Sequence, residues 1–243
     1  MTTRIEAYER LRAPAGASPP LLLTCEHASN ALPPGWAWPE EDGWLVEMHW
    51  AWDPGAAALT RALAERLGCP AVLSTFSRLL VDPNRPPGSD TMFREVADGR
   101  PVVLNRDRTA EDERRRLEAC YEPYHAAVAA MVAEHPGVPL LSMHTFTPLY
   151  EGTPREVEIG VLFDDDEAWG LAWFEALRGG AYDVRVNEPW SGRLGLMYSV
   201  QRHARREGRR CVELEIRQDH ATDAVEAARI VDLLARAWEI VGA

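Results

Sequence analysis

Short apolar runs alternate with helical segments along this chain, and the alternation restricts its fold more than any other feature. The apolar runs predict strands at residues 21–24, 71–76, 140–143, 158–163, 183–190 and 211–216, the fifth of which continues into a loop. Apolar residues at helical spacing predict helices at residues 56–67, 109–134, 167–177, 198–207 and 222–241. This order predicts an α/β fold, a three-layer α/β/α sandwich around a mostly parallel mixed sheet. We expect residues 1–243 to form a single domain.

Proline and glycine mark the interruptions in this pattern. The segment 31–44 holds Pro33, Pro34 and Gly35, which predict a loop. Pro123 falls inside the predicted helix 109–134. An internal proline removes a backbone hydrogen bond and its ring crowds the preceding turn. We therefore expect that helix to bend at Pro123.

The charge balance limits the partners that the chain can bind. The sequence has 38 acidic against 26 basic residues, a formal charge of -12, and all of the basic residues are arginine. Such a balance disfavours nucleic acid and anionic membranes as partners, so an anionic ligand would need local arginines. The first 13 residues lack the apolar segment of a secretion signal, and no later stretch has the length of a membrane span. We expect a soluble cytoplasmic protein, with its four separated cysteines reduced.

Two histidines stand directly after predicted strands. His27 lies in Thr24-Cys25-Glu26-His27-Ala28-Ser29-Asn30, and His144 lies in Leu141-Ser142-Met143-His144-Thr145. Because the carboxyl ends of parallel strands meet at one edge of a sheet, we expect the two imidazoles to lie close together. Two imidazoles and one anionic ligand form the open zinc site of hydrolytic enzymes. The pair therefore predicts a zinc site.

Asp53 is the natural third ligand, because it stands just before the helix that follows the first strand. Its segment, Asp53-Pro54-Gly55, also fits a simpler interpretation in which the aspartate caps the helix and Pro54 occupies the first helical position. Glu26 and His49 are alternative ligands. Sequence reasoning leaves this choice open.

The last strand carries two acidic residues that packing alone does not explain. Glu213 and Glu215 alternate with aliphatic residues, and Arg217 follows them. Glu215 is nearer the carboxyl end of the strand, so we expect it to act as the general base for the attacking water, with Glu213 as the alternative. Arg217 or a nearby amide would stabilise the oxyanion. The simpler alternative is an internal Glu-Arg pair.

Two proline-braced loops offer polar groups for a ligand. Arg85 lies in Asp82-Pro83-Asn84-Arg85-Pro86, where a guanidinium can bind a carboxylate through two hydrogen bonds. The second loop is Asn187-Glu188-Pro189-Trp190-Ser191-Gly192. It is either a pocket wall or ordinary surface structure.

Together these segments resemble the N-formylglutamate amidohydrolase family. The resemblance rests on residues 25–30, Trp-Asp-Pro-Gly at 52–55, Ser77-Arg78 with residues 82–85, Met-His-Thr-Phe at 143–146, and the loop 187–192. It implies a phosphorylase/hydrolase-like fold. It also implies metal-dependent hydrolysis of an N-formyl or N-acyl amino acid such as N-formylglutamate, with one Zn²⁺ as the cofactor.

Three of these segments are also similar to zinc carboxypeptidases. Residues 143–146 resemble the segment around the last zinc histidine of those enzymes, and Glu215-Ile216-Arg217 resembles their Glu-Leu-Arg with its catalytic glutamate. Asn84-Arg85 resembles the pair that holds a substrate carboxylate. Carboxypeptidases have a glutamate three residues after the first histidine, where this chain has Asn30. Cell-wall amidases of similar fold take that ligand from the start of the next helix, where Asp53 lies.

The resulting hypothesis is a zinc-dependent amidohydrolase that acts on a small anionic N-acyl amino acid. Its metal ligands are His27, Asp53 and His144, and its catalytic residues are Glu215 and Arg217. Its substrate-binding residues are Asn30, Asn84, Arg85, Asn187 and Ser191. The alternatives are a metallocarboxypeptidase, a peptidoglycan-type amidase, or a non-catalytic protein that binds small anions on the same fold. The oligomeric state is left open.

Overall fold

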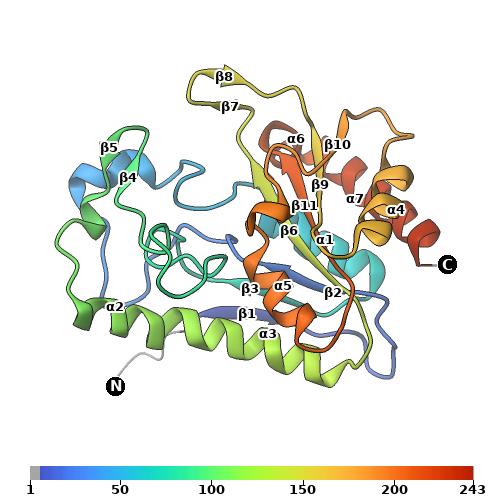
Figure 1. Cartoon of the computed structure of the whole chain (residues 1–243), viewed down its shortest axis with the longest axis horizontal. Coiled ribbons are helices and arrows are strands. Elements are labelled where there is room, and N and C mark those ends of the chain that lie inside the picture. The colour runs from blue at the N-terminus through green and yellow to red at the C-terminus, as the bar shows by residue number, and fades with distance from the viewer. Residues whose placement is uncertain (1–5, 243) are drawn as a thin grey trace.

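The computed structural model describes residues 6–242, which are built around a seven-stranded sheet (Figure 1). The strand order is β1-β3-β2-β6-β11-β9-β10. The strands are β1 (Tyr8–Leu11), β2 (Leu22–Cys25), β3 (Ala71–Ser74), β6 (Leu140–Phe146), β9 (Ile159–Leu162), β10 (Val184–Val186) and β11 (Cys211–Arg217). Strands β3, β2, β6 and β11 run parallel to one another, while β1 is antiparallel to β3 and β9 is antiparallel to β11. The predicted mostly parallel mixed sheet is confirmed.

Helices cover both faces of this sheet. One face packs against α1 (Ala56–Leu67), α4 (Glu167–Leu177) and α7 (Ala224–Val241), and the other against α3 (Glu122–Glu134) and α5 (Tyr198–Arg205). The remaining helical elements are η1 (Glu40–Leu45), η2 (Val103–Asn105), α2 (Ala110–Arg116), η3 (Leu117–Tyr121), η4 (Gly192–Leu194) and α6 (Gln218–Thr222). Two small hairpins pair β4 (Val96–Ala97) with β5 (Arg100–Pro101), and β7 (Leu149–Tyr150) with β8 (Thr153–Pro154). The predicted three-layer α/β/α sandwich is confirmed.

Two local predictions need correction. The helix expected at 109–134 is confirmed, since α2, η3 and α3 follow one another without a break from Ala110 to Glu134. Its irregular turn is the π-helical η3, which ends before Pro123; that proline lies in the first turn of α3, where a missing N–H is tolerated. Part of the predicted loop 31–44 belongs to the short helix η1.

Asp53 does not cap helix α1, so the simpler interpretation of this residue is wrong. The N-cap is Gly55, with φ of 89°, and no side chain caps the helix. A Cβ on Gly55 would stand 2.7 Å from the backbone oxygen of Ala221, so glycine is required there for space as well as conformation. The Asp53 carboxylate is thereby left available for other partners.

The central strands place apolar and polar side chains on opposite faces of the sheet. On β6, Leu141 and Met143 join the core beneath α1, α4 and α7, whereas Ser142 and His144 point to the opposite face. His144 lies inside β6 and not beyond its end, because the strand continues to Phe146. On β11, Glu215 pairs with His144 in the parallel register.

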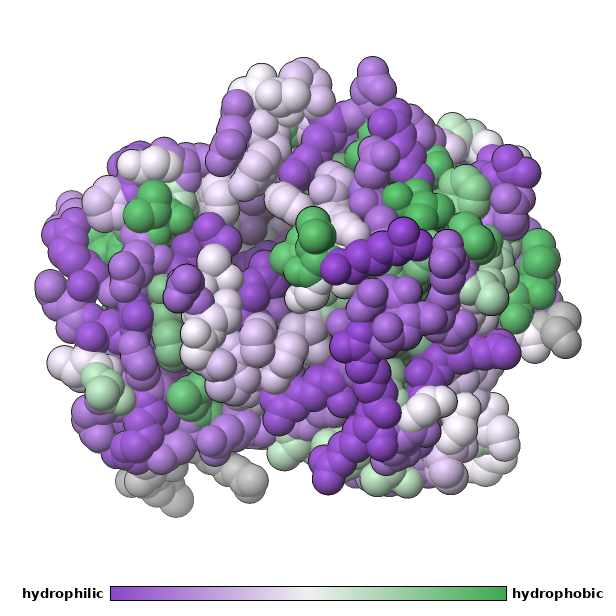
Figure 2. Space-filling view, viewed as in Figure 1, coloured by the Kyte–Doolittle hydropathy of each residue, from purple (hydrophilic) through white to green (hydrophobic). Residues whose placement is uncertain are grey.

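The surface agrees with the composition. Figure 2 shows one face of the molecule as mostly hydrophilic, with apolar residues in small separate groups. Within residues 6–242, every helix is too short or too polar to cross a membrane.

Candidate active site

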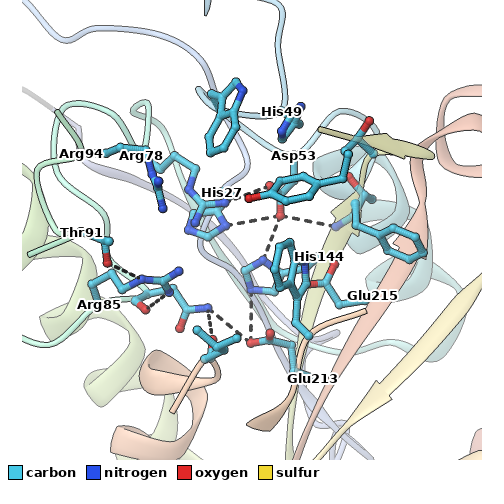
Figure 3. Close-up of a pocket in the computed structure, with 18 of the residues that line it drawn as sticks. His27, His49, Asp53, Arg78, Arg85, Thr91, Arg94, His144, Glu213 and Glu215 are labelled. Atoms are coloured by element: carbon cyan, nitrogen blue, oxygen red, sulfur yellow. Dashed lines mark hydrogen bonds and ion pairs between the residues drawn. The ribbon is translucent and has the colours of Figure 1, made fainter. Parts of the chain in front are cut away.

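Two histidines and one aspartate meet in the interior of the molecule (Figure 3). His27 follows β2, Asp53 precedes α1, and His144 lies on β6. Asp53 Oδ2 is 3.3 Å from His27 Nδ1 and 2.9 Å from His144 Nδ1. All three side chains are buried, and one ligand atom from each lies within 4.8 Å of the others. The structure therefore brings together the three predicted metal ligands.

A second layer of carboxylates holds the opposite nitrogen of each imidazole. His27 Nε2 is 2.8 Å from Asp82 Oδ1, and His144 Nε2 is 3.1 Å from Glu26 Oε2. A partner on Nε2 fixes the orientation of an imidazole and directs its Nδ1 lone pair to the other side, as is usual around metal ions. Glu26 therefore lies behind His144. The other alternative ligand, His49, lines the cavity but is not a member of the three-residue group.

Glu26 is itself fully buried and has two further donors. Tyr124 Oη donates to its Oε1 at 2.9 Å, and Ser142 Oγ donates to its Oε2 at 2.5 Å. Burial alone would raise the pKa of Glu26, but the hydrogen bonds from His144 and Ser142 hold that pKa well below its usual value. Glu26 is thus a permanent anion beneath the site.

The negative charges of the site's carboxylates favour the presence of a cation among them. Burial opposes protonation of His144, yet Glu213, Asp53 and Glu26 raise its pKa well above the usual value. Burial would likewise raise the pKa of Asp53, but His27 and His144 hold it well below its usual range. Imidazole nitrogens and a carboxylate oxygen are donors that a zinc ion prefers. The donor set fits a divalent metal ion.

Glu213 and Glu215 project from β11 beside His144. Burial raises the pKa of Glu213 to about 7 and that of Glu215 well above its usual value. Oε2 of Glu215 is buried without a hydrogen-bond partner among the described residues. A carboxyl group with a raised pKa can both take up and release a proton near neutral pH. Its free oxygen marks Glu215 as a candidate acid-base group.

These groups open into one cavity of about 280 Å³. Its wall includes the predicted substrate residues Asn84 and Arg85. Asn84 is fixed by the backbone N–H of Ser199, which donates to its Oδ1 at 2.9 Å. Arg85 donates from Nε to Thr91 Oγ1 at 3.1 Å and from Nη1 to the carbonyl of Asn84 at 2.7 Å. Both side chains are therefore held in position before any ligand arrives.

Four other predicted site residues do not line this cavity. Asn30 donates to the carbonyl of Val46, and Asn187 Oδ1 accepts from the N–H groups of Phe163 and Gly192, which closes its own loop. Arg217 is paired with Asp219 and Glu158. Ser191 is the N-cap position of η4. Local hydrogen bonds or ion pairs occupy the first three side chains.

The cavity wall contains residues to which sequence reasoning gave no role. Arg78 lines the cavity, while Asp82 lies behind His27 and does not reach the wall. Both residues lie in segments that carried the family resemblance, so a signal existed for them. Arg94, Tyr150 and Arg155 had no signal, because nothing in their sequence neighbourhoods separates them from surface residues. Of the loop 187–192, it is Trp190 that reaches the cavity.

Known proteins resemble this chain in sequence and in fold. A family model described as N-formylglutamate amidohydrolase matches residues 19–221. A solved structure of a gene product from Agrobacterium tumefaciens is 33% identical to this chain, with a TM-score of 0.86, and the match covers 97% of this chain and 93% of that one. The N-formylglutamate amidohydrolase of Ralstonia eutropha JMP134 is 20% identical, with a TM-score of 0.71 and 98% of each chain covered. Among curated proteins, no sequence matches. The chain belongs to the N-formylglutamate amidohydrolase family, whose members are hydrolases that act on amides.

Proposed function

We propose that this protein is a zinc-dependent amidohydrolase that cleaves the amide of an N-formyl or N-acyl amino acid, such as N-formylglutamate. One observation carries the proposal. The buried group His27, Asp53 and His144 lies beside Glu215, in a cavity whose wall holds Arg85. Metal ligands, an acid-base group and a carboxylate anchor are the parts that hydrolysis of an N-acyl amino acid requires.

The metal would be held by the Nδ1 atoms of His27 and His144 and by the carboxylate of Asp53. When bound, it supplies a Lewis acid that polarises the amide carbonyl and promotes attack by water. Asp82 and Glu26 accept hydrogen bonds from the Nε2 atoms of the two imidazoles and keep both rings in place. Arg78 bonds to Asp82 at 2.8 Å and maintains that carboxylate's orientation.

The protein's own groups position the substrate and move the proton. Asn84 and Arg85 hold the α-carboxylate of the amino acid, which places the adjacent amide near His144 and Glu215. Glu215 takes the proton of the attacking water and then gives it to the nitrogen of the leaving amine. The register that pairs Glu215 with His144 supports this role, because it sets Glu215 beside a residue that is proposed to bind the metal. Because Asn30, Asn187, Ser191 and Arg217 lie off the cavity, the proposal gives them no role.

The test combines metal analysis with a substrate screen. Zinc-loaded protein is expected to bind one equivalent of metal and to release free amine from N-formyl or N-acetyl amino acids. His144→Ala is expected to lose the metal; retention of one equivalent at wild-type affinity would show that the ligand assignment is wrong. Dipeptides serve as the competing substrates, and faster cleavage of these would favour a metallocarboxypeptidase. Protein that holds no divalent metal, and is inactive with added zinc, would favour an anion-binding protein.

A further inference from the structure

Four arginines line the cavity, and they differ in what neutralises them. Arg78 forms ion pairs with Asp82 at 2.8 Å and with Asp53 at 3.5 Å. Arg85, Arg94 and Arg155 form no ion pair with any carboxylate of residues 6–242. Arginines that face a cavity and have no acidic residue paired with them are available to an anionic ligand. More than one such cation is present, so one carboxylate on the ligand does not account for them all.

The strand order separates these cations into two positions. Arg85 and Arg94 follow β3, the metal ligands lie at β2 and β6, Glu215 lies on β11, and Arg155 stands just before β9. In the sheet order β3-β2-β6-β11-β9, the segment of Arg155 therefore leads into the strand farthest from β3, and its guanidinium lies over Trp190, which follows the next strand, β10. Figure 3 shows Arg85 and Arg94 on one side of the histidines and Glu215 on the other. In Figure 1 the hairpin β7–β8, which leads to Arg155, extends from the end of β6.

Charge effects agree with this separation. Burial lowers the pKa of Arg94, and Arg78 and Arg85 lower it further, so these three arginines are close neighbours. Burial also lowers the pKa of Arg155, and the groups that oppose this effect are Glu215 and then Tyr150. Tyr150 opposes the lowering of the Arg94 pKa as well, so Glu215 is the group that distinguishes Arg155. Arg155 therefore belongs to the Glu215 end of the cavity.

Arg155 is held by aromatic rings and leaves most of its donors free. Its guanidinium carbon is 4.5 Å from the ring centre of Tyr150 and 4.6 Å from that of Trp190. Within the described chain it donates one hydrogen bond, to the carbonyl of Thr147 at 3.4 Å. Stacking on aromatic rings fixes the plane of a guanidinium and removes water from its faces, while its edge keeps the geometry that suits a carboxylate. This arrangement is preorganised for an anion.

We propose that Arg155 is a specificity-determining residue that binds a second carboxylate of the substrate, at the end of the cavity opposite Asn84 and Arg85. The inference rests on the proposed function, because Asn84 and Arg85 are taken to hold the α-carboxylate. The second carboxylate is carried either by the side chain of the amino acid or by its acyl group. Both sources present the same chemistry to Arg155.

The test compares charged and neutral substrates of matched shape in zinc-loaded protein. N-formylglutamate and N-formylglutamine differ in the side-chain carboxylate, and N-succinylalanine and its terminal amide differ in the acyl carboxylate. Arg155→Gln is expected to raise KM for the charged member of one pair by about 10- to 100-fold, because loss of a hydrogen bond to a charged group usually weakens binding by this factor. The value of kcat should change little. The neutral members should be unaffected. The pair that responds identifies the source of the carboxylate.

Two control variants separate binding from a structural role. Arg94 neighbours Arg78 and Arg85 and lies over Trp50, not over Trp190, so Arg94→Gln should weaken both members of a pair equally. Arg155→Lys retains the charge without the planar stacking and should restore part of the preference for the charged member. Equal losses for charged and neutral members in Arg155→Gln, with a lowered melting temperature, would show that Arg155 only joins the hairpin to the Trp190 loop and would overturn the inference.

Direct binding distinguishes failure of this inference from failure of the proposed function. If no substrate is cleaved, the proposed function fails, and calorimetry still measures binding of the same four compounds to the wild type and to Arg155→Gln. A wild-type preference for a charged compound that disappears in the variant would support the role of Arg155. Absence of any such preference in the wild type would overturn it.

Discussion

The two faces of the central sheet bury different kinds of side chain from the same strands. Toward α1, α4 and α7, strands β6 and β11 present aliphatic residues and methionine, such as Leu141 and Leu214, with Thr145 as the polar exception near the end of β6. Toward α3 and α5 the alternate positions include Leu140, which joins an apolar core on that side, and then the buried polar residues His144, Glu213 and Glu215. Burial of apolar surface stabilises the first face, whereas burial of charge costs free energy on the second. The face toward α1, α4 and α7 (the apolar face) therefore contributes mainly to the fold, whereas the face toward α3 and α5 (the polar face) combines an apolar core with the groups of the candidate site.

Replacement of Glu215 by glutamine is expected to have the largest effect, and it acts on the polar face alone. Glu215→Gln keeps the shape but cannot transfer a proton, so kcat should fall by about 10²- to 10⁴-fold. Stability should be maintained or increased, because a neutral amide replaces a buried carboxyl whose ionisation is unfavourable. Steady-state kinetics and urea unfolding measure the two quantities.

Glu213→Gln is the matched control for this experiment. It changes the same chemical group two residues earlier on the same face of β11. We expect a smaller loss of kcat and unchanged metal content in both variants. A larger loss in Glu213→Gln would transfer the role of general base to Glu213.

A large truncation on the apolar face should produce the opposite result. Trp173, in α4, is fully buried. Its ring centre lies 6.1 Å from that of Trp169, in an edge-to-face arrangement, and 6.2 Å from that of Trp238. Trp173→Ala should lower the free energy of unfolding by about 3–5 kcal/mol, since it removes a large side chain and leaves a cavity. Metal affinity of the folded variant should stay at the wild-type value. A metal affinity that fell together with stability would contradict the division between the faces.

A smaller effect is expected from substitution of Glu26, whose carboxylate accepts a hydrogen bond from Nε2 of His144. In Glu26→Gln one of the two oxygens becomes an NH2 group, while the other still accepts. If the NH2 group replaces the oxygen that faces Ser142 and His144, two donors meet at the Nε2 hydrogen of His144; in the opposite orientation the NH2 group faces the hydroxyl of Tyr124, and the charge is lost in either case. Zinc affinity should fall by about 10- to 100-fold, as is usual when the outer partner of a metal-bound histidine is lost. Competition with a chelator measures the change.

Ser142→Ala provides the comparison for Glu26. It removes one donor from Glu26 but keeps the carboxylate and its contact with His144. Its effect on zinc affinity should be smaller than that of Glu26→Gln. Equal effects would mean that the hydrogen-bond network as a whole, and not the charge of Glu26, fixes His144.

The division between the faces also explains what could be predicted from the sequence. Six of the seven strands of the main sheet, and the helices that cover it, follow from apolar periodicity, which is a local property, and the structure confirms them. The edge strand β1 was not predicted, because its sequence Tyr-Glu-Arg-Leu has too few apolar residues to show a pattern. His27 and His144 were expected together because parallel strands share one edge of a sheet. The strand β11 alternates Glu213 and Glu215 with aliphatic residues, so its two faces could be assigned directly from the sequence.

The rest depends on contacts between distant segments. The role of Glu26 requires Tyr124 from α3 and Ser142 from β6, and neither position carries a local signal. The ambiguity of Asp53 arose because an Asp-Pro pair before a helix has the same local pattern whether it caps the helix or binds a metal. The hairpin that leads to Arg155 has strands of two residues, too short for any periodicity.

The smallest effect is expected from a pair of histidines, His125 in α3 and His203 in α5, to which the proposed mechanism gives no role. His125 Nδ1 and His203 Nε2 are 2.9 Å apart, and both residues are buried. Burial lowers the pKa of His125 to about 3 and that of His203 to about 4. Because the unfolded chain binds protons more readily, the stability that each neutral histidine contributes is present above about pH 6.5 and is lost as the pH falls toward the folded pKa.

Each histidine should therefore cost about 1 kcal/mol of stability between about pH 7.5 and pH 5.5. His203→Gln removes one of the two titrating groups, so its stability should decline less steeply with falling pH than that of the wild type, whatever its absolute value. Urea unfolding at several pH values measures both slopes. Since His203 lies away from the metal ligands, zinc content should not change. Equal slopes would show that this pair is not protonated on unfolding, and the acid sensitivity of the polar face would then rest on its carboxylates alone.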